Sequence, residues 1–225
     1  MRYGDVIGSL RESYDNSADE RNATVREPWK AEERAAFLGR LRRQRATRLL
    51  EVGAGVGTDS LFFQEQGLSV VATDLSPQMV AKCQEKGLDA RVAGFLDLDF
   101  RPESFDAVYA FNCLLHVPNA DLPPVLETIR LLLRPGGMFF VAVYGGDATE
   151  GVWDGDWVAP HRFFSLRTND QIQQLARGSF ELVDFHTRNE SSARPSQLLT
   201  LRRAASPAGG PGLSSRQFTY SDLIL

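Results

Sequence analysis

The stretch LLEVGAGVGTDS, from Leu49 to Ser60, decides the fold, because a short apolar run passes into three glycines at alternating positions. An apolar run of this length is typical of a buried strand, and Thr58 and Asp59 suit the start of a helix. In an open α/β sheet, ligands bind just outside the carboxyl ends of the strands, where such turns lie. Gly53 and Gly55 can adopt positive φ and leave the backbone bare for a ligand, and the N–H groups that follow favour an anion.

The spacing of these glycines argues against two common nucleotide sites. The dinucleotide pattern G-x-G-x-x-G requires a third glycine at position 58 or 60, and the chain has Thr58 and Ser60 there. A phosphate-binding P-loop would continue into Lys-Ser or Lys-Thr, which is missing here. A nicotinamide-dependent oxidoreductase is therefore disfavoured, and the pattern that remains is E-x-G-x-G-x-G from Glu51 to Gly57.

Composition narrows the classes of function. The chain has 225 residues, a net charge of −4 and a pI near 5.5, so no global basic field attracts nucleic acid or anionic membrane. No stretch approaches the length of a membrane span, and we expect a cytoplasmic protein. Cys83 and Cys113 lack CxxC partners and the three histidines lack ligand spacing, so we expect no structural metal. The acids of WDGDW, residues 153–157, are more typical of a turn than of a magnesium site.

The rest of the chain alternates short apolar strands with amphipathic helices, which indicates crossover units and a parallel sheet. A hairpin near the end could close that sheet, and a Gly-, Asp- and aromatic-rich loop at 145–165 interrupts the rhythm. We expect an N-terminal cap segment over residues 1–44, one domain over 45–203 and a flexible tail over 204–225. The expected strands are 48–52, 69–73, 90–93, 105–110, 138–143, 180–187 and 197–202, and the expected helices are 29–43, 59–66, 77–86, 122–133 and 169–176.

Further motifs follow the glycine turn in a fixed order. VVATDLS ends the second strand on Asp74, whose carboxylate could bridge a ribose diol. RVAGFLDLDF, FDAVYAFNCLLHVP and LLLRPGGMFFVAVY accompany the third, fourth and fifth strands. With this ordered set, residues 45–145 resemble the class I S-adenosylmethionine (SAM)-dependent methyltransferases, in the group that acts on small molecules.

The resemblance implies a Rossmann-like, doubly wound α/β fold with a seven-stranded sheet, an antiparallel last strand and a helical N-terminal cap. It implies that the Gly53–Gly55 turn holds the methionine part of SAM, that Glu51 supports its ammonium and that Asp74 binds the ribose. Where many members have an acid after the third strand, this chain has Gly94, so adenine recognition would pass to backbone. The cofactor residues it implies are Tyr14, Glu51, Gly53, Ala54, Gly55, Asp74, Leu75, Met79, Gly94, Phe95, Leu96, Ala110, Phe111 and Asn112.

Several side chains are candidates for the methyl-acceptor end. His116, just past the fourth strand, could act as a general base or orient the acceptor, and it could equally cap a turn. The aromatic loop could be a lid with His161, less favoured, as a second catalytic candidate, or its rings could simply anchor a long connection. The substrate-binding candidates are Trp29, Tyr144, Trp153, Trp157, His161 and Arg162.

These features lead to one expected function and one alternative. We expect methyl transfer from SAM to a small metabolite or natural-product acceptor, with oxygen or nitrogen favoured, by a monomer or homodimer that binds neither nucleic acid nor membrane. The alternative is a non-catalytic SAM-binding or scaffold protein that keeps the methyltransferase fold, because intact cofactor motifs argue for binding and not for turnover.

Overall fold

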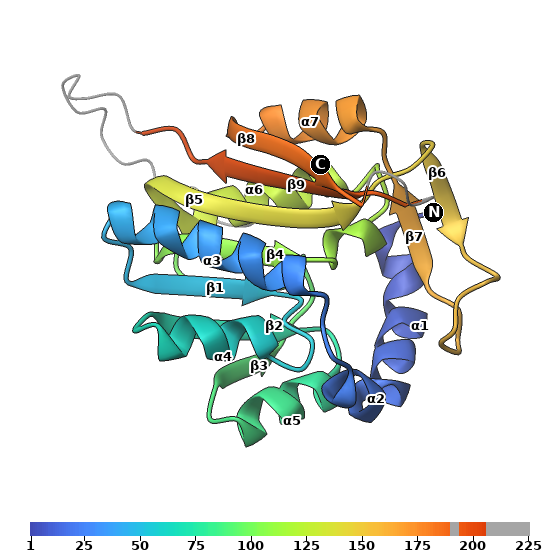
Figure 1. Cartoon of the computed structure of the whole chain (residues 1–225). Coiled ribbons are helices and arrows are strands. Elements are labelled where there is room, and N and C mark those ends of the chain that lie inside the picture. The colour runs from blue at the N-terminus through green and yellow to red at the C-terminus, as the bar shows by residue number, and fades with distance from the viewer. Residues whose placement is uncertain (190–193, 206–225) are drawn as a thin grey trace.

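A seven-stranded sheet runs through the molecule in the order β3-β2-β1-β4-β5-β9-β8 (Figure 1). The computed structural model describes residues 1–189 and 194–205. All neighbouring strands are parallel except β9, which is antiparallel to both β5 and β8. The strands are β1 Arg48–Val52, β2 Ser69–Asp74, β3 Asp89–Val92, β4 Phe105–Phe111, β5 Leu133–Tyr144, β8 Glu181–Arg188 and β9 Ser196–Arg202.

The strand order reverses at β1, and this places a crevice beside the glycine turn. β1 pairs with β2 on one side, with Leu50 opposite Val71, and with β4 on the other, with Leu50 opposite Val108. The connections from the carboxyl ends of β1 and β4 therefore lead away from each other, and a ligand crevice opens between them. Both apolar runs are buried, as the sequence predicts for central strands.

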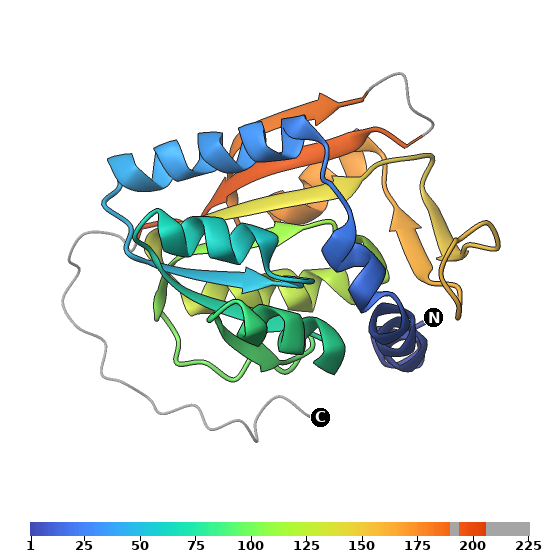
Figure 2. The ribbon, with the colours of Figure 1, turned by 60° about the horizontal axis from the view of Figure 1, so that its bottom comes forward.

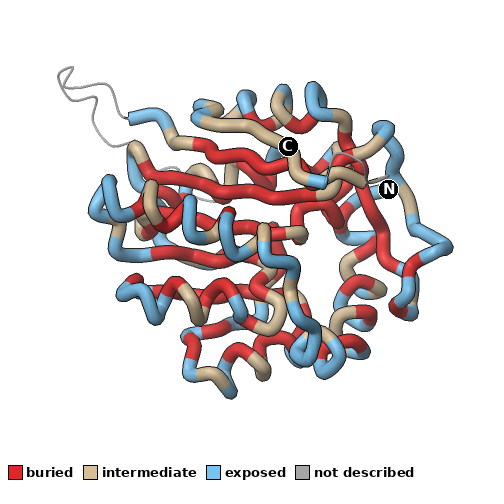
Figure 3. The backbone as a smooth tube through the Cα atoms, in the orientation of Figure 1, coloured by how far each residue is buried: buried red, intermediate tan, exposed pale blue. Residues whose placement is uncertain are grey.

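Helices cover both faces of the sheet, as Figures 1 and 2 show. On one face lie α3 Pro28–Arg43, α4 Thr58–Glu65 and α5 Pro77–Glu85, and on the other lie α6 Leu122–Leu132 and α7 Asn169–Arg177. Phe37 of α3 and Phe63 of α4 pack against Tyr109 of β4, whereas Ile129 of α6 is buried with Phe139 of β5. Figure 3 shows the consequence, buried strands between helices whose outer faces are exposed.

Two further helices form a cap at the carboxyl ends of the parallel strands (Figures 1 and 2). They are α1 Tyr3–Asn16 and α2 Ala18–Ala23. Tyr3, Val6 and Leu10 of α1 are buried in the same apolar cluster as β1 and β4, so this helix is part of the core. The expectation of a helical cap is confirmed, although the sequence analysis assigned regular structure only from Trp29 onward within it.

A hairpin stands where the sequence predicted an irregular loop. β6 Thr149–Val152 pairs with β7 Phe163–Leu166 in a separate two-stranded sheet. The turn between these strands touches the cap, because Asn16 Nδ2 donates to the carbonyl oxygen of Ala159 at 3.0 Å. Ser13 Oγ donates to the carbonyl of Pro160 as well. Cap and hairpin therefore close over the same end of the sheet.

The predicted fold class is confirmed, and the seven predicted strands and five predicted helices recur with end shifts of at most one residue, except that β5 begins at Leu133, five residues before the predicted start. A short 3-10 helix, η1 Leu114–His116, follows β4 and was not foreseen. Most of the predicted C-terminal tail, from residue 206 onward, lies outside the described residues. Within the described ranges, no helix is both long and apolar enough to cross a bilayer.

Candidate active site

The glycine turn after β1 forms the floor of the site, and its glycines serve two different purposes. Gly53 and Gly55 have φ of 67° and 55°, a region that favours glycine. A Cβ added at Gly53 would lie 2.4 Å from the Cβ of Cys113, so that side chain fills the space. A Cβ added at Gly55 would meet no atom within 4 Å. Gly55 is thus the glycine that leaves room for a ligand.

Asp74, at the end of β2, is held by backbone N–H groups. Its Oδ2 accepts from Gly55 N at 2.8 Å and its Oδ1 accepts from Ser76 N at 2.9 Å. Burial raises the pKa of this carboxyl, and these two hydrogen bonds lower it in part. A carboxylate can accept about four hydrogen bonds, so each oxygen keeps capacity for a ligand hydroxyl.

Glu51 lies beneath the turn and holds a proton more firmly than an ordinary carboxyl. It is buried, and Ser60 Oγ donates to its Oε2. Burial raises the pKa of Glu51 well above its ordinary range, and the charge of Asp59 raises it further. A cation bound above the turn would favour the ionised form of this side chain.

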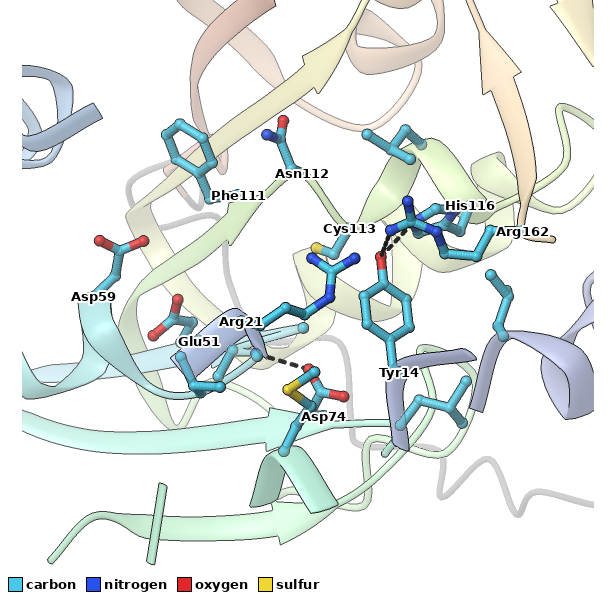
Figure 4. A pocket seen from close by; sticks show the side chains of 18 of the residues that line it. Tyr14, Arg21, Glu51, Asp59, Asp74, Phe111, Asn112, Cys113, His116 and Arg162 are labelled. Carbon is cyan, nitrogen blue, oxygen red and sulfur yellow. Dashed lines mark hydrogen bonds between the residues drawn. The ribbon is translucent and has the colours of Figure 1, made fainter. Parts of the chain in front are cut away.

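Tyr14 and His116 form a hydrogen-bonded pair at the other end of the site (Figure 4). His116 Nδ1 lies 2.6 Å from the carbonyl oxygen of Phe163 and therefore donates to it. In neutral His116, Nε2 is then the acceptor, and it receives the hydroxyl of Tyr14 at 2.6 Å. Burial lowers the pKa of His116 to about 3, so the imidazole is neutral near pH 7. Arg162 Nη1 also donates to the Tyr14 hydroxyl, at 3.3 Å.

Arg162 is fixed by an acid of the WDGDW stretch. Its Nε and Nη2 donate to the two carboxylate oxygens of Asp156 at 2.7 and 2.6 Å. This buried pair explains Asp156 without a metal ion, and its guanidinium lies over the ring of Phe164. Among residues 1–189 and 194–205, no group of three or more His, Cys, Asp or Glu is placed to hold a metal.

One cavity of about 470 Å³ joins these groups (Figure 4). Its lining combines residues that the sequence analysis assigned to the cofactor with residues that it assigned to the acceptor. From the first set it contains Tyr14, Glu51, Gly53, Ala54, Gly55, Asp74, Leu75, Met79, Gly94, Phe95, Phe111 and Asn112. From the second set it contains His116, Tyr144, Trp153, Trp157 and Arg162.

Four other candidates do not line this cavity. Ala110 is fully buried in the sheet, and Leu96 is half-exposed on the surface. Trp29 packs against Phe111, with ring centroids 5.9 Å apart, instead of facing the cavity itself. His161 is exposed, because successive residues of an extended chain point in opposite directions and Arg162 points inward.

The structure adds cavity-lining residues that the sequence analysis missed. Arg21 and Arg26 belong to the cap, where charged residues in a polar run resemble an ordinary solvated surface. Asp59 pairs with Arg26 and Arg34 across a gap in sequence that no local pattern reveals. Cys113 could have been suspected from its place in the FNC motif after β4. The other missed residues are Tyr3, Leu10, Thr24, Lys30, Val56, Thr58, Ala93, Leu115, Phe164 and Arg194.

Buried polar atoms in the cavity indicate that a ligand belongs there. Asn112, at φ 54°, has a buried Oδ1 without a hydrogen-bond partner within the part of the chain that the structure describes. An unsatisfied buried acceptor is costly unless a ligand or water donates to it. Together with the open space at Gly55 and the spare acceptor capacity of Asp74, it fits a polar ligand with several donors.

The central part of the chain matches known sequences. Residues 49–137 match the family described as a methyltransferase domain. The ubiquinone biosynthesis O-methyltransferase of Xylella fastidiosa is 35% identical over 102 residues, which cover 42% of this chain and 41% of that protein. The glycine N-methyltransferase of Mus musculus is 31% identical over 131 residues, covering 49% and 45%. The matched segment therefore spans less than half the length of these relatives.

A solved structure resembles nearly the whole chain. It is the 1,6-didemethyltoxoflavin-N1-methyltransferase of Burkholderia thailandensis, with bound 1,6-didemethyltoxoflavin and S-adenosylhomocysteine. The two structures align with a TM-score of 0.66 at 25% identity, over 87% of each chain. The two chains therefore share a fold over most of their length.

Proposed function

We propose that this chain, whose residues 49–137 match a methyltransferase domain, is a class I SAM-dependent methyltransferase that transfers the methyl group of SAM to a small organic acceptor, at oxygen or nitrogen. The observation that carries the proposal is the single cavity that joins the Gly55–Asp74 end to the Tyr14–His116 end. A nucleoside and an acceptor could occupy the two ends of this cavity side by side. Residues 1–44 would act as its cap, and residues 45–203 would form the catalytic domain.

The residues around the glycine turn suit the nucleoside and methionine parts of SAM. Asp74 would accept both ribose hydroxyls, and the bare backbone from Gly53 through Ala54 to Gly55 would lie along the methionine part. Glu51 and the unpartnered Oδ1 of Asn112 would attract the ammonium group, directly or through water. Leu75, Met79 and Phe95 would provide apolar surface for the adenine ring, and Gly94 would offer backbone groups.

Methyl transfer from SAM depends more on the alignment of the acceptor and the exclusion of water than on acid–base groups. Bound SAM supplies an electrophilic methyl group, and the chain must orient the acceptor in line with it and exclude water. Trp153, Trp157 and Phe164 provide a partly apolar cover on the acceptor side. Ser13 and Asn16 tie that cover to the cap.

The Tyr14–His116 pair would position the acceptor rather than remove a proton from it. The only basic lone pair of neutral His116, the in-plane lone pair on Nε2, already accepts the Tyr14 hydroxyl. The lowered pKa of His116, about 3, also makes its imidazole a poor proton acceptor. The acceptor should therefore arrive with a free lone pair, as a neutral amine, an ionised phenol or a carboxylate does.

The relatives support both an oxygen and a nitrogen acceptor, since their names describe O- and N-methyltransferases. Their acceptors range from a ubiquinone precursor to glycine and 1,6-didemethyltoxoflavin, so the class of a small molecule is the shared property. A cytoplasmic location and a monomeric or homodimeric state stay predictions.

Titration calorimetry with SAM and S-adenosylhomocysteine tests the cofactor part of the proposal, and transfer from radiolabelled SAM to a panel of acids, phenols and amines tests turnover. Asp74→Ala should weaken binding of both nucleosides by about 1–3 kcal/mol, because their hydroxyls lose a buried charged partner. The control is Asp99→Ala, a position outside the cavity lining. An unchanged dissociation constant for Asp74→Ala would show that the ribose lies elsewhere.

A further inference from the structure

Arg21 of α2 places a half-buried side chain in the cavity, with its Nη2 atom buried. Its Nε donates to Ser17 Oγ at 2.9 Å, which orients the group. The guanidinium carbon lies 4.7 Å from the ring centroid of Tyr14 and 5.1 Å from that of Trp157. Figure 4 shows the side chain projecting into the same space as Tyr14 and Asp74. Its position is therefore fixed by the protein, from a segment that lines the cavity.

The Arg21 guanidinium has an N–H donor group that no described residue accepts from. Its Nη2 is buried and makes no hydrogen bond within residues 1–189 and 194–205. None of the ion pairs found in these ranges includes Arg21. In contrast, three other cations of the lining have carboxylate partners, since Arg26 pairs with Asp59, Lys30 with Glu27 and Arg162 with Asp156. A buried cation without a counter-ion is costly, and a bound anion would remove the cost.

The charge balance of the site favours the same conclusion. SAM carries a sulfonium, and the guanidinium groups of Arg162 and Arg21 both lie over the Tyr14 ring, at 5.4 and 4.7 Å from its centroid. Burial lowers the pKa of His116, and the charges of these two groups lower it further. An anionic group between these cations would be attracted by all of them. The aromatic rings of Trp153, Trp157 and Phe164 in the same lining suit a flat apolar body attached to that anion.

We propose that Arg21 is the specificity-determining residue of the acceptor site and that the acceptor is an aromatic or apolar molecule with a carboxylate or phosphate group. The planar fork of Arg21 binds two oxygens of that group, and the apolar body lies against Trp157. This inference rests on the proposed function. The carboxylate of SAM itself is the other source of such an anion, but two other cations also line the cavity, Lys30 and Arg26, and Arg26 pairs with Asp59 at the start of α4.

The test measures binding of benzoate, phenyl phosphate and the neutral benzamide by calorimetry, both to the free protein and to protein saturated with S-adenosylhomocysteine. The variants are Arg21→Gln, which removes the charge, and Arg21→Lys, which keeps the charge and removes the fork. Arg11→Gln, an exposed arginine on α1 of the same cap, is the matched control. Thermal unfolding of each variant verifies that it folds.

The wild type and Arg11→Gln should bind the two anions more tightly than benzamide. Arg21→Gln should lose about tenfold or more in anion affinity, the effect of a charged hydrogen bond, and should bind benzamide as before. Arg21→Lys should retain part of the preference. S-adenosylhomocysteine affinity should stay within about twofold in every variant, because Arg21 does not hold the cofactor.

Three results would overturn the inference. The first is equal affinity of the wild type for benzoate and benzamide, and the second is anion binding that survives Arg21→Gln. The third is a selective loss of S-adenosylhomocysteine binding in Arg21→Gln, which would assign the guanidinium to the methionine carboxylate. If the wild type fails to bind S-adenosylhomocysteine, the proposed function fails, and anion binding to the free protein still decides the role of Arg21.

Discussion

At Glu51, the stability of the free protein and the binding of a cationic ligand favour opposite ionisation states of the carboxyl group. It is buried beneath the turn that we assign to SAM, where its raised pKa keeps it protonated beyond its ordinary value of 4.5. A cationic ligand above the turn would pull that proton off, so binding should release protons to solution and tighten as pH rises. In the free protein this carboxyl is buried without a bound cation beside it, and this lowers the stability of the folded state.

Glu51→Gln should change how stability depends on pH. The unfolded chain ionises Glu51 near pH 4.5 while the folded chain still holds its proton, so wild-type folding takes up a proton above this pH. The free energy of unfolding of the wild type should therefore fall relative to Glu51→Gln, by up to about 1.4 kcal/mol per pH unit, until the folded carboxyl also ionises. Urea unfolding at pH 5, 6, 7 and 8 measures this. Parallel curves for the two proteins would contradict it.

Tyr14 and His116 should behave as one unit, because each fixes the other through a single hydrogen bond. Tyr14→Phe and His116→Ala should each slow turnover roughly tenfold to hundredfold through a misplaced acceptor, and the double variant should be little worse than either. Binding of S-adenosylhomocysteine should change little in His116→Ala. His186→Ala, which removes a contact between β8 and Glu33 of α3, is the control and should leave turnover intact. Additive losses in the double variant would argue against the pair.

Among the elements, the cap formed by α1 and α2 depends most on what fills the cavity. Tyr3, Leu10, Tyr14 and Arg21 all reach the lining from these two helices. A bound nucleoside would therefore contact both the cap and the glycine turn, and would lower the population of states in which the cap is open.

S-adenosylhomocysteine should protect the cap against trypsin. Cleavage after Arg21 and after Arg26 should slow when the nucleoside is bound, because both side chains line its cavity. Cleavage after Arg177, at the exposed end of α7, should keep its rate and serves as the internal control. Mass spectrometry of timed digests gives the three rates. Equal slowing at all three positions would point to global stabilisation alone.

The sequence predicted helices and strands well where the buried residues recur at a short, regular spacing. The apolar runs of β1 and β4 and the Ser76–Pro77 start of α5 are local signals, and Ser76 Oγ does accept from Met79 N. Helix α1 was missed although its buried residues 3, 6, 10 and 13 follow helical spacing, because Gly4 and Gly8 weaken the pattern. The β6–β7 hairpin could not be predicted, since Glu150 of β6 is held by the backbone N–H of Asn119, which is distant in sequence.

At the scale of the whole molecule, the topology explains which site residues the sequence could reveal. Glu51, Gly55 and Asp74 follow strand ends, and parallel strands bring such residues together wherever this fold forms. Arg21 and Phe164 reach the site through the cap and the hairpin, whose docking depends on tertiary contacts such as Asn16 with Ala159. The proposed acceptor end was therefore harder to predict from the sequence than the proposed cofactor end.

Binding at the junction of sheet, cap and hairpin should stabilise the entire fold. S-adenosylhomocysteine at about 100 times its dissociation constant should add about 2.7 kcal/mol, which for a chain of this size raises the melting temperature by roughly 5–11 °C. Differential scanning fluorimetry measures the shift. Asp74→Ala at the same nucleoside concentration should show a much smaller one. A wild type whose melting temperature does not respond would contradict the proposed site.

The contact between Gly53 and Cys113 has a consequence for redesign and for natural variation. The thiol side chain after β4 occupies the hollow that the missing methyl leaves in the turn after β1. The segment that carries His116 therefore packs directly against the turn after β1. A larger side chain at position 53 or 113 would displace both the segment and the turn. Variation at positions 53 and 113 should be correlated among homologues. New acceptor preferences should be easier to reach by altering Trp153 and Trp157, which line the cavity from the connection between β6 and β7.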